Sequence, residues 1–311
     1  MSLTHFTLRQ IETFVCVADL HSFAGAAQRL GMTPQAVSLL IAELETTLSF
    51  RLFDRTTRRV NLSTAGRDFL ASAETIMRHV RAAETAADDV RNRAAGVVRI
   101  GAPLVLAATA LPAAIREYQA TRPKVIVRVR DLSVDALVDA VSVGDVDLAV
   151  GPDRIVNYSV QREVLFDSLW VLWCSKNHTL AKQKVLRWRD LMGTPLVAAG
   201  RDHEHSVSKM RLSTPEGERV TPIDVVDNIS TALGIAGEGL AVTLAPAYVG
   251  ALAPAFHLVM KRVVDPEVLR TVCLYRSSLR AASAAVEGFS EFLGPWLAEW
   301  SKQFTHQNPP N

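Results

Sequence analysis

Apolar residues recur three and four positions apart in three successive stretches of the first fifty residues, which is the spacing of amphipathic helices. Each stretch begins with a residue suited to cap a helix: Thr7, Ser22 and Thr33. Gly31 suits a left-handed stop between the second and third helices, and Pro34 fits a first helical turn, where a missing N–H costs nothing. The pattern predicts a compact group of three helices.

The third predicted helix, residues 33–48, has two distinct faces. Its inward positions are Val37, Leu40, Ile41, Leu44 and Leu48, and its outward positions are Gln35, Ser38, Leu39 and Ala42. Two helices joined so tightly are typical of a helix-turn-helix, whose second helix enters the DNA major groove. An ordinary helical hairpin fits this pattern equally well.

A basic segment follows directly. It carries Arg51, Arg55, Arg58 and Arg59 against a single Asp54, within two short runs prone to form strands. This predicts a basic hairpin, or wing, because arginine forks suit phosphate oxygens. A solvated charged turn is the alternative.

Residues 63–95 predict one long helix, capped by Ser63. Its apolar residues alternate four and three apart, which predicts a coiled-coil seam and a dimer: Phe69, Ala73, Ile76, Val80, Ala83, Ala87 and Val90. A dimer reads two half-sites of a partly palindromic operator. A long helix packed on its own domain is the alternative, since three seam positions are alanine.

From residue 96 the pattern changes to short apolar strands alternating with helices. The strands include VVRIG, KVIVRVR and VDLAVG, with helices between them at Ala110–Ala120 and Val134–Val143, which predicts a mainly parallel α/β sheet. SLWVLWC, TPLVAA, IDVV and GLAVTLAP form a second set, and LRTVCLYR with a helix at Ala281–Ser301 returns to the first. The expected boundaries are 1–62 for the head, 63–95 for the linker helix, 96–301 for the α/β part and 302–311 for a tail. Within the α/β part, subdomain I takes 96–165 and 262–301, and subdomain II takes 166–261.

Composition excludes several classes of protein. The 311 residues are 49% hydrophobic with a formal net charge of +2, so any nucleic-acid surface is local. Three scattered cysteines argue against a disulfide framework or zinc knuckle and favour a reducing cytoplasm. We find no export signal and no apolar run long enough to span a membrane, and we expect no cofactor.

The chain resembles LysR-type transcriptional regulators along nearly its whole length. The residues that carry the resemblance are Phe14, Ser22, Phe23, Ala26, Ala27, Leu30, Thr33, Ala36, Val37, Ser38, Ile41, Leu44, Glu45, Leu52, Phe53, Arg55, Leu62, Ala65 and Gly66. The resemblance implies a winged helix-turn-helix, a long linker helix, and a two-subdomain effector domain similar to periplasmic solute-binding proteins. It also implies a tetramer on DNA.

The DNA contacts follow from the same resemblance and from the outward face of the third helix. We expect them at Ser22, Thr33, Pro34, Gln35, Ser38, Leu39, Arg55, Arg58 and Arg59. Members of the family usually carry polar or basic side chains where Leu39 and Leu40 stand, and a glycine near Ser49. Leu40 joins the inward face, but Leu39 does not. We therefore hypothesise that Leu39 touches a thymine methyl group in the groove.

The effector is expected between the two subdomains, beyond the carboxyl ends of the strands and near helix N-termini. The expected lining is Ala102, Pro103, Leu104, Ser133, Gly151, Arg201, His203, Asn228 and Ser230. The first loop, GAPLVLAAT, has no hydroxyl before Thr109, where many members of the family have a serine or threonine. We hypothesise a small, partly apolar organic acid held by Arg201 and main-chain N–H groups. A solvated loop arginine is the alternative.

No catalytic or metal site is expected. His203 and His205 flank Glu204 but lack a third ligand and the usual spacing of zinc sites. Asp167, Ser168 and His178 have no nucleophile turn around the serine, and the tryptophans suit core packing. A transporter's solute-binding component would have no use for residues 1–95, and an enzyme would need a converging acid, base or nucleophile. A DNA-binding regulator is the prediction.

Overall fold

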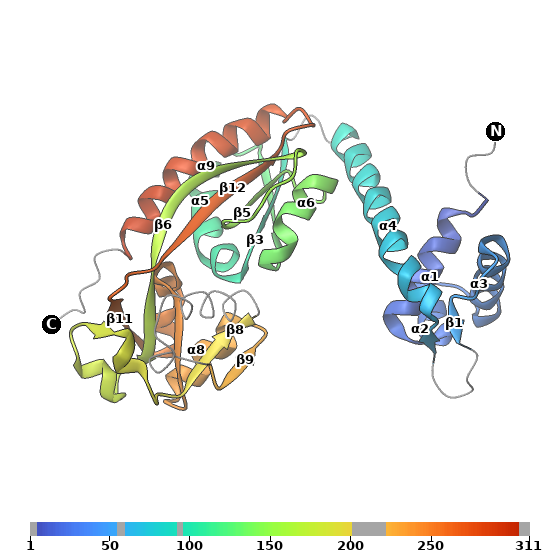
Figure 1. The fold of residues 1–311 in the computed structure, drawn as a ribbon. Coiled ribbons are helices and arrows are strands. Elements are labelled where there is room, and N and C mark those ends of the chain that lie inside the picture. Colours follow the sequence, from blue (N-terminus) through green and yellow to red (C-terminus); the bar gives the residue numbers. More distant parts are fainter. Residues whose placement is uncertain (1–4, 55–59, 92–95, 201–221, 305–311) are drawn as a thin grey trace. The chain divides into compact units, whose positions relative to one another are not determined.

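The computed structural model describes residues 5–54, 60–91, 96–200 and 222–304, with the backbone alone for residues 82 and 85–91. These residues form two compact units that divide between Arg91 and Asn92. Figure 1 shows the fold of each unit. Among the described helices, none is long and apolar enough to cross a membrane.

The first unit contains four helices and a two-stranded hairpin among its described residues. Its elements are α1 (Leu8–Leu20), α2 (Phe23–Leu30), α3 (Pro34–Leu48), β1 (Phe53–Asp54), β2 (Asn61–Leu62) and α4 (Thr64–Arg91). β1 and β2 pair antiparallel, as expected for the wing. The core gathers the inner faces of α1, α2 and α3 around Ile11, Phe14, Val37 and Leu44, all fully buried.

The predicted caps of this unit are confirmed. The Gln10 N–H donates to Thr7 Oγ1 (3.2 Å) and Gln10 Oε1 accepts from the Thr7 N–H (2.8 Å), which completes a capping box. The Gly66 N–H donates to Ser63 Oγ (2.9 Å) at the start of α4. Gly31 ends α2 with a left-handed φ of 65°, which costs glycine little.

The first part of the predicted coiled-coil seam packs inside this unit. Ala73 is fully buried, and Phe69 and Ile76 pack on the core of the three short helices. Phe14 and Phe69 bring their ring centroids to 5.7 Å. Ala73 is therefore not available to a second chain, whereas Phe69 and Ile76 are half-buried and keep part of their surface accessible.

The described residues of the second unit form a ten-stranded sheet with helices on both faces. Its strands are β3 (Val97–Ala102), β4 (Ile126–Asp131), β5 (Leu148–Pro152), β6 (Val160–Ser175), β7 (Leu186–Arg187), β8 (Leu196–Ala199), β9 (Asp224–Val226), β10 (Val242–Pro246), β11 (Leu258–Val264) and β12 (Leu269–Ser277). The strand order is β4-β3-β5-β12-β6-β10-β8-β9, and β11 joins β6 and β7. Its α-helices are α5 (Leu111–Thr121), α6 (Leu137–Val143), α8 (Ile229–Gly237) and α9 (Ala284–Lys302).

Shorter helical turns also occur among the described residues of this unit. They are η1 (Leu106–Ala110), η2 (Val134–Ala136), η3 (Thr179–Lys182), η4 (Trp188–Leu191), η6 (Ala247–Ala251) and η7 (Ala253–Phe256). β3 pairs parallel with β4 and β5, and β8 pairs parallel with β9 and β10, as the strand and helix alternation predicts. The sheets of the two subdomains are mixed, because β12 pairs antiparallel with β5 and β6, and β6 pairs antiparallel with β10 and β11.

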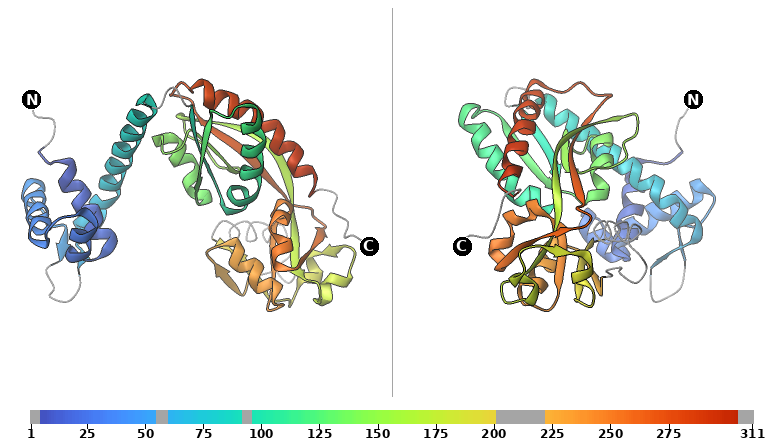
Figure 2. Two further views of the ribbon diagram at one scale, coloured as in Figure 1. Left: turned by 180° about the vertical axis from the view of Figure 1, so that it is seen from behind. Right: turned by 60° about the vertical axis from the view of Figure 1, so that its left-hand side comes forward.

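The helices of the first subdomain cover opposite faces of its sheet (Figures 1 and 2). Along β12, Val272 and Leu274 join the core beneath α5 and α9, whereas Cys273 and Tyr275 join the core beneath α6. This alternation follows from the two-residue period of a strand. Both faces of β12 are apolar because both faces are covered.

The strand β6 passes from one subdomain to the other. Residues 160–169 pair with β12, and residues 170–175 pair with β10 and β11. The expected boundary at 165/166 therefore lies inside β6, and the one at 261/262 lies inside β11. The first half of β6 shows no apolar pattern in the sequence, because Gln161–Glu163 are polar and exposed. In β11 the apolar pattern is interrupted by Lys261, whose Nζ donates to the Gln183 carbonyl (2.9 Å).

The end of the chain also departs from expectation. The last helix begins at Ala284, where the Val286 N–H donates to Ser283 Oγ (3.3 Å), and continues to Lys302. Phe304, predicted to lie in a tail, is buried and packs edge-on against Trp300 at 4.8 Å. Apolar contact therefore extends the domain beyond residue 301.

Candidate DNA-binding and effector sites

The third helix buries one face and exposes the other, as predicted. Val37, Ile41 and Leu44 are buried in the core of the first unit. The outward residues Gln35, Ser38, Leu39 and Ala42 are exposed, and Leu39 has 60% of its surface accessible. Within the first unit, this face of α3 is free to meet a ligand.

Two of the predicted DNA-contacting hydroxyl groups also cap helices. Thr33 Oγ1 accepts the Ala36 N–H (3.2 Å), and Ser22 Oγ accepts the Gly25 N–H (3.0 Å). A hydroxyl that accepts a backbone N–H keeps its own O–H for donation. The caps fix these side chains at the N-termini of α2 and α3, where the helix dipole favours an anion such as phosphate.

Glu45 connects α3 to the wing, a contact that the sequence analysis missed. Its Oε1 accepts the N–H groups of Leu52 (2.7 Å) and Phe53 (3.3 Å). Ser63 closes the other side of the wing: its N–H donates to the Leu52 carbonyl (2.9 Å) and its Oγ donates to the Arg51 carbonyl (2.6 Å). The base of the wing is thus held at a fixed position relative to α3.

The basic residues expected in the wing are only partly covered by the structure. Arg51 is described and exposed at the base of the wing. Arg55, Arg58 and Arg59 lie outside the described residues. Their expected contacts with phosphate therefore stay predictions.

Part of the expected effector site gathers at the carboxyl ends of β3, β4 and β5. The Leu132 N–H donates to the Ala102 carbonyl (3.0 Å), and exposed Ser133 follows it. An ideal Cβ placed on Gly151 would lie 2.4 Å from Leu137 Cδ1 and 3.2 Å from Pro103 Cδ. A larger residue at position 151 would therefore displace the Leu137 side chain, and Pro103 and Gly151 are neighbours.

The other part of the expected site lies in the second subdomain. Asn228 precedes α8 and is exposed, and Ser230 in the first turn is half-buried. Gly200 follows β8 and lies beside this turn, with its ideal Cβ 3.5 Å from the Asp227 carbonyl oxygen. Arg201 and His203 lie outside the described residues. The predicted residues thus form two groups, one at the carboxyl ends of the parallel strands of each subdomain.

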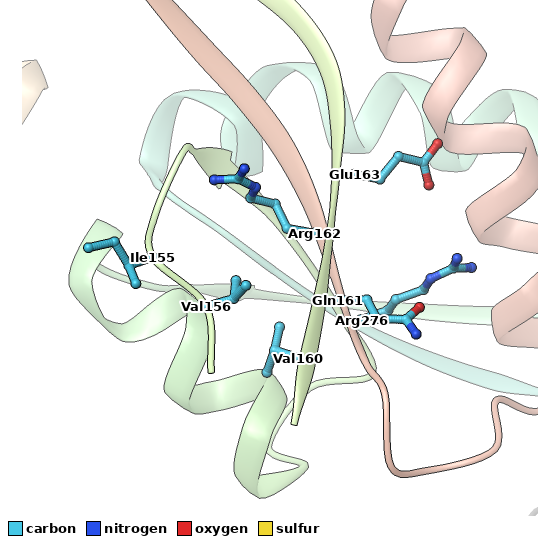
Figure 3. Close-up of a pocket in the computed structure, with 7 residues that line it drawn as sticks. All are labelled: Ile155, Val156, Val160, Gln161, Arg162, Glu163 and Arg276. Carbon is cyan, nitrogen blue, oxygen red and sulfur yellow. The ribbon is translucent and has the colours of Figure 1, made fainter. Parts of the chain in front are cut away.

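A pocket that the sequence analysis did not predict opens on another part of the first subdomain (Figure 3). Its volume is about 630 Å³, and its lining residues are Ile155, Val156, Val160, Gln161, Arg162, Glu163 and Arg276. Arg162 forms an ion pair with Asp153 at its rim. The pocket shares no residue with the expected effector site.

The side chains considered for catalysis have separate structural partners. Ser168 Oγ accepts the Tyr248 N–H (3.3 Å), Asp167 accepts the Thr271 hydroxyl (2.6 Å), and His178 Nδ1 accepts the Leu180 N–H (3.2 Å). The tryptophans expected in the core, Trp170, Trp173 and Trp188, are buried. Among the described residues no three His, Cys, Asp or Glu side chains gather to hold a metal, and His203 and His205 lie outside them.

The three cysteines are buried thiols without a disulfide partner. Burial raises the pKa of both Cys174 and Cys273 to about 11, and nearby Asp153 adds to the effect at Cys273. Burial also raises the pKa of Cys16. Such thiols are neutral near pH 7 and are poor nucleophiles.

Family models match both units of the chain. Residues 8–67 match the model described as "Bacterial regulatory helix-turn-helix protein, lysR family", and residues 91–298 match the model described as "LysR substrate binding domain". The chain belongs to the LysR family. It is a DNA-binding transcriptional regulator with a substrate-binding domain, and the family consists of regulators, not enzymes. The family and fold class predicted from the sequence are confirmed.

Relatives match this LysR-type chain over nearly its whole length. "Transcriptional dual regulator GltC" of Bacillus subtilis (strain 168) is 29% identical over 289 residues, covering 92% of this chain and 96% of the relative. "HTH-type transcriptional regulator ShiR" of Corynebacterium glutamicum (strain R) is 30% identical over 287 residues, covering 90% and 96%.

Solved structures of LysR regulators share the fold. The crystal structure of CbnR superposes with a TM-score of 0.69 at 18% identity, covering 93% of this chain and 98% of CbnR. Full-length CbnR complexed with its target DNA gives a TM-score of 0.67, also at 18% identity, covering 93% and 99%. At this identity the likeness concerns the fold.

Proposed function

We propose that this LysR-type regulator binds double-stranded DNA with α3 in the major groove and responds to a small-molecule effector. The observation that carries the first part is the free outward face of α3, with the wing fixed beside it through Glu45. In this proposal Gln35, Ser38 and Leu39 meet base edges. The cap residues Ser22, Thr33 and Pro34, together with Arg55, Arg58 and Arg59, hold phosphates at the flanks.

We also propose that the chain self-associates through the second half of α4. The first seam residues serve the core of the head, but Val80 is half-buried and Ala83 is exposed. A seam that starts near Val80 would pair two chains and place two heads on two half-sites. By analogy with the family, we propose that two such dimers form a tetramer. We also propose that the protein works in the cytoplasm.

For the effector we propose a small, partly apolar organic acid between the two subdomains. Apolar Pro103 and Leu104 line the end of β3, and the N-terminus of α8 supplies main-chain N–H groups near Asn228 and Ser230. Arg201 and His203 would complete the site from the following loop. The fixed positive charge of Arg201 suits a carboxylate.

The connection between effector and DNA would pass through β6 and the strands paired with it. Because β6 belongs to both sheets, closure of the subdomains around an effector bends the same strand that joins them. In this proposal closure alters the arrangement of paired chains, and with it the spacing or bending of the half-sites. The effector would then shift the equilibrium between two populated arrangements of the paired chains.

A gel-shift assay with the DNA that flanks the protein's own gene tests the proposed function. We expect a discrete complex that competitor DNA of random sequence does not displace. A library of small organic acids, screened by thermal shift of tryptophan fluorescence, identifies the effector because binding raises the stability of the folded state. If Arg201→Ala binds the identified acid with unchanged affinity, Arg201 is not part of the effector site. If DNA footprints are identical with and without the acid, the proposed coupling between effector binding and DNA binding is refuted.

A further inference from the structure

The pocket on the first subdomain lies at a free edge of the sheet. Residues 160–169 of β6 pair with β12, and no other described strand pairs with them. An edge strand directs backbone N–H and C=O groups away from its partner, because only every second residue is bonded to that partner. The pocket therefore offers main-chain donors and acceptors to a ligand, in addition to the side chains that line it.

Two charged side chains of the pocket have no protein partner. Glu163 and Arg276 are exposed, and among the described residues neither forms an ion pair or a side-chain hydrogen bond. The other charged lining residue, Arg162, is paired with Asp153. The pocket therefore contains one carboxylate and one guanidinium group that are free to bind a ligand.

The register of the two strands places these free charges on one face of the sheet. Glu163 lies opposite Leu274, and Arg276 follows Leu274 by two positions, so Glu163 and Arg276 are diagonal neighbours. Diagonal neighbours in an antiparallel pair are roughly 7–8 Å apart, which leaves room for a small group between their side chains. Figure 3 shows both side chains extending to the same side of β6. Opposite charges thus lie side by side without contacting each other.

The rest of the pocket is mainly apolar and lies across the edge of β6. Val160 is buried, Val156 is half-buried, and Ile155 has 95% of its surface accessible. In Figure 3, Ile155 and Val156 lie on the other side of the strand from Glu163 and Arg276. The volume of about 630 Å³ is within the usual range of small-molecule sites. A ligand whose apolar part passes round the edge would remove the surface of Ile155 from water.

We infer that this pocket binds a small zwitterion with an aliphatic side chain, namely an α-amino acid. Its carboxylate pairs with Arg276 and its ammonium group pairs with Glu163. Such a molecule fits because it carries opposite charges on neighbouring carbon atoms, so each charge faces one of the two diagonal side chains. Its aliphatic side chain covers Ile155 and Val156. The pocket shares no residue with the expected effector site, and the inference does not depend on the proposed function.

Isothermal titration calorimetry of the full-length protein tests the site, with L-leucine as the probe. Isocaproic acid lacks the ammonium group of leucine, and isoamylamine lacks its carboxylate. We expect each analogue to bind about tenfold more weakly than leucine, because each loses one charged hydrogen-bonding group. Glycine should also bind more weakly, because it has no side chain to cover the apolar part of the pocket.

Two variants of the pocket identify the partner of each charge. Arg276→Gln and Glu163→Gln should each weaken leucine binding about tenfold. Arg276→Gln should bind leucine and isoamylamine equally, because the carboxylate has lost its partner, and Glu163→Gln should bind leucine and isocaproic acid equally. The matched controls are Arg116→Gln on α5 and Glu291→Gln on α9, which remove exposed charges elsewhere in the same unit and should leave the affinity for leucine unchanged.

The inference is overturned if the wild-type protein does not bind leucine, or if either pocket variant retains the wild-type affinity. Equal binding of leucine and one of its two analogues by the wild-type protein also overturns it, because the site then does not require a zwitterion. Since Glu163 and Arg276 are both exposed, the variants should keep the fold. Thermal unfolding followed by tryptophan fluorescence checks this.

Discussion

Replacement of Glu45 by alanine should loosen the wing and destabilise the DNA-binding unit. The Glu45 carboxylate accepts two backbone N–H groups, those of Leu52 and Phe53, at 2.7 and 3.3 Å. Both residues are buried, with 0% and 6% of their surface accessible. Their N–H groups would therefore lose their acceptor in a place with little access to water.

The expected cost can be worked from these contacts. A hydrogen bond to a charged group contributes about 1.5–3 kcal/mol, and the longer second bond contributes less than the first. We expect Glu45→Ala to lower the free energy of unfolding of the first unit by about 2–4 kcal/mol. For a unit of this size, the unfolding midpoint then falls by at least about 8 °C. Glu45→Gln keeps one acceptor oxygen and should lose about 1 kcal/mol.

The distribution of aromatic residues allows this measurement in the full chain. All five tryptophans lie in residues 92–311, so tryptophan fluorescence reports on the second unit alone. We expect Glu45→Ala to lower the midpoint temperature of the unfolding transition seen by circular dichroism. The midpoint of the transition seen by tryptophan fluorescence should not change. Glu74→Ala, an exposed carboxylate on α4, is the matched control and should move neither. A midpoint for Glu45→Ala equal to that of the control would refute the assigned role.

The remaining predictions concern close packing and buried thiols. Gly66→Ala should destabilise the first unit by more than about 2 kcal/mol, because an ideal Cβ would lie 2.1 Å from the Leu52 carbonyl oxygen, whereas Gly25→Ala, with its nearest atoms at 3.4 Å, should stabilise α2 by about 0.5–1 kcal/mol. Thermal unfolding followed by circular dichroism checks both variants. The folded pKa of about 11 at Cys174 and Cys273 exceeds the ordinary value of 9.0, so the unfolded chain releases protons first and stability falls between pH 9 and 11. The slope is about 1.4 kcal/mol per pH unit for each thiol. Fluorescence-detected denaturation at several pH values measures it, and a Cys174→Ala variant with an undiminished slope would contradict it.

The local features of the head could be predicted because each depends on neighbouring residues. The caps at Thr7, Ser22 and Thr33 use a hydroxyl and an N–H three positions further on, so the spacing alone specifies them. The face of α3 that contains Gln35 and Ser38 follows from helical periodicity in the same way. No contact with a distant residue is needed for either prediction.

Contacts between distant elements could not be predicted from spacing. Glu45 matches a family position, but its role depends on the chain turning back after Phe50 to present two N–H groups. The first half of β6 carries Gln161, Arg162 and Glu163, which suit a solvated loop as well as a strand at the edge of a sheet. Its pairing with β12 joins residues more than one hundred positions apart. Only the folded sheet specifies that contact.

The distribution of charge in the first unit favours different elements for phosphate contacts and for base contacts. Residues 1–91 contain ten arginines, ten carboxylates and no lysine, so the unit as a whole has no net charge to attract DNA. Four of those arginines lie between residues 51 and 59, directly after α3, which has no positively charged side chain. Phosphate contacts position a protein on DNA, and base contacts give specificity. If the wing supplies the phosphate contacts and α3 supplies the base contacts, a substitution on α3 changes the sequence preference. A substitution in the wing then changes the salt dependence of binding. Glu45 then couples base recognition to phosphate binding, because it fixes the distance between α3 and the wing.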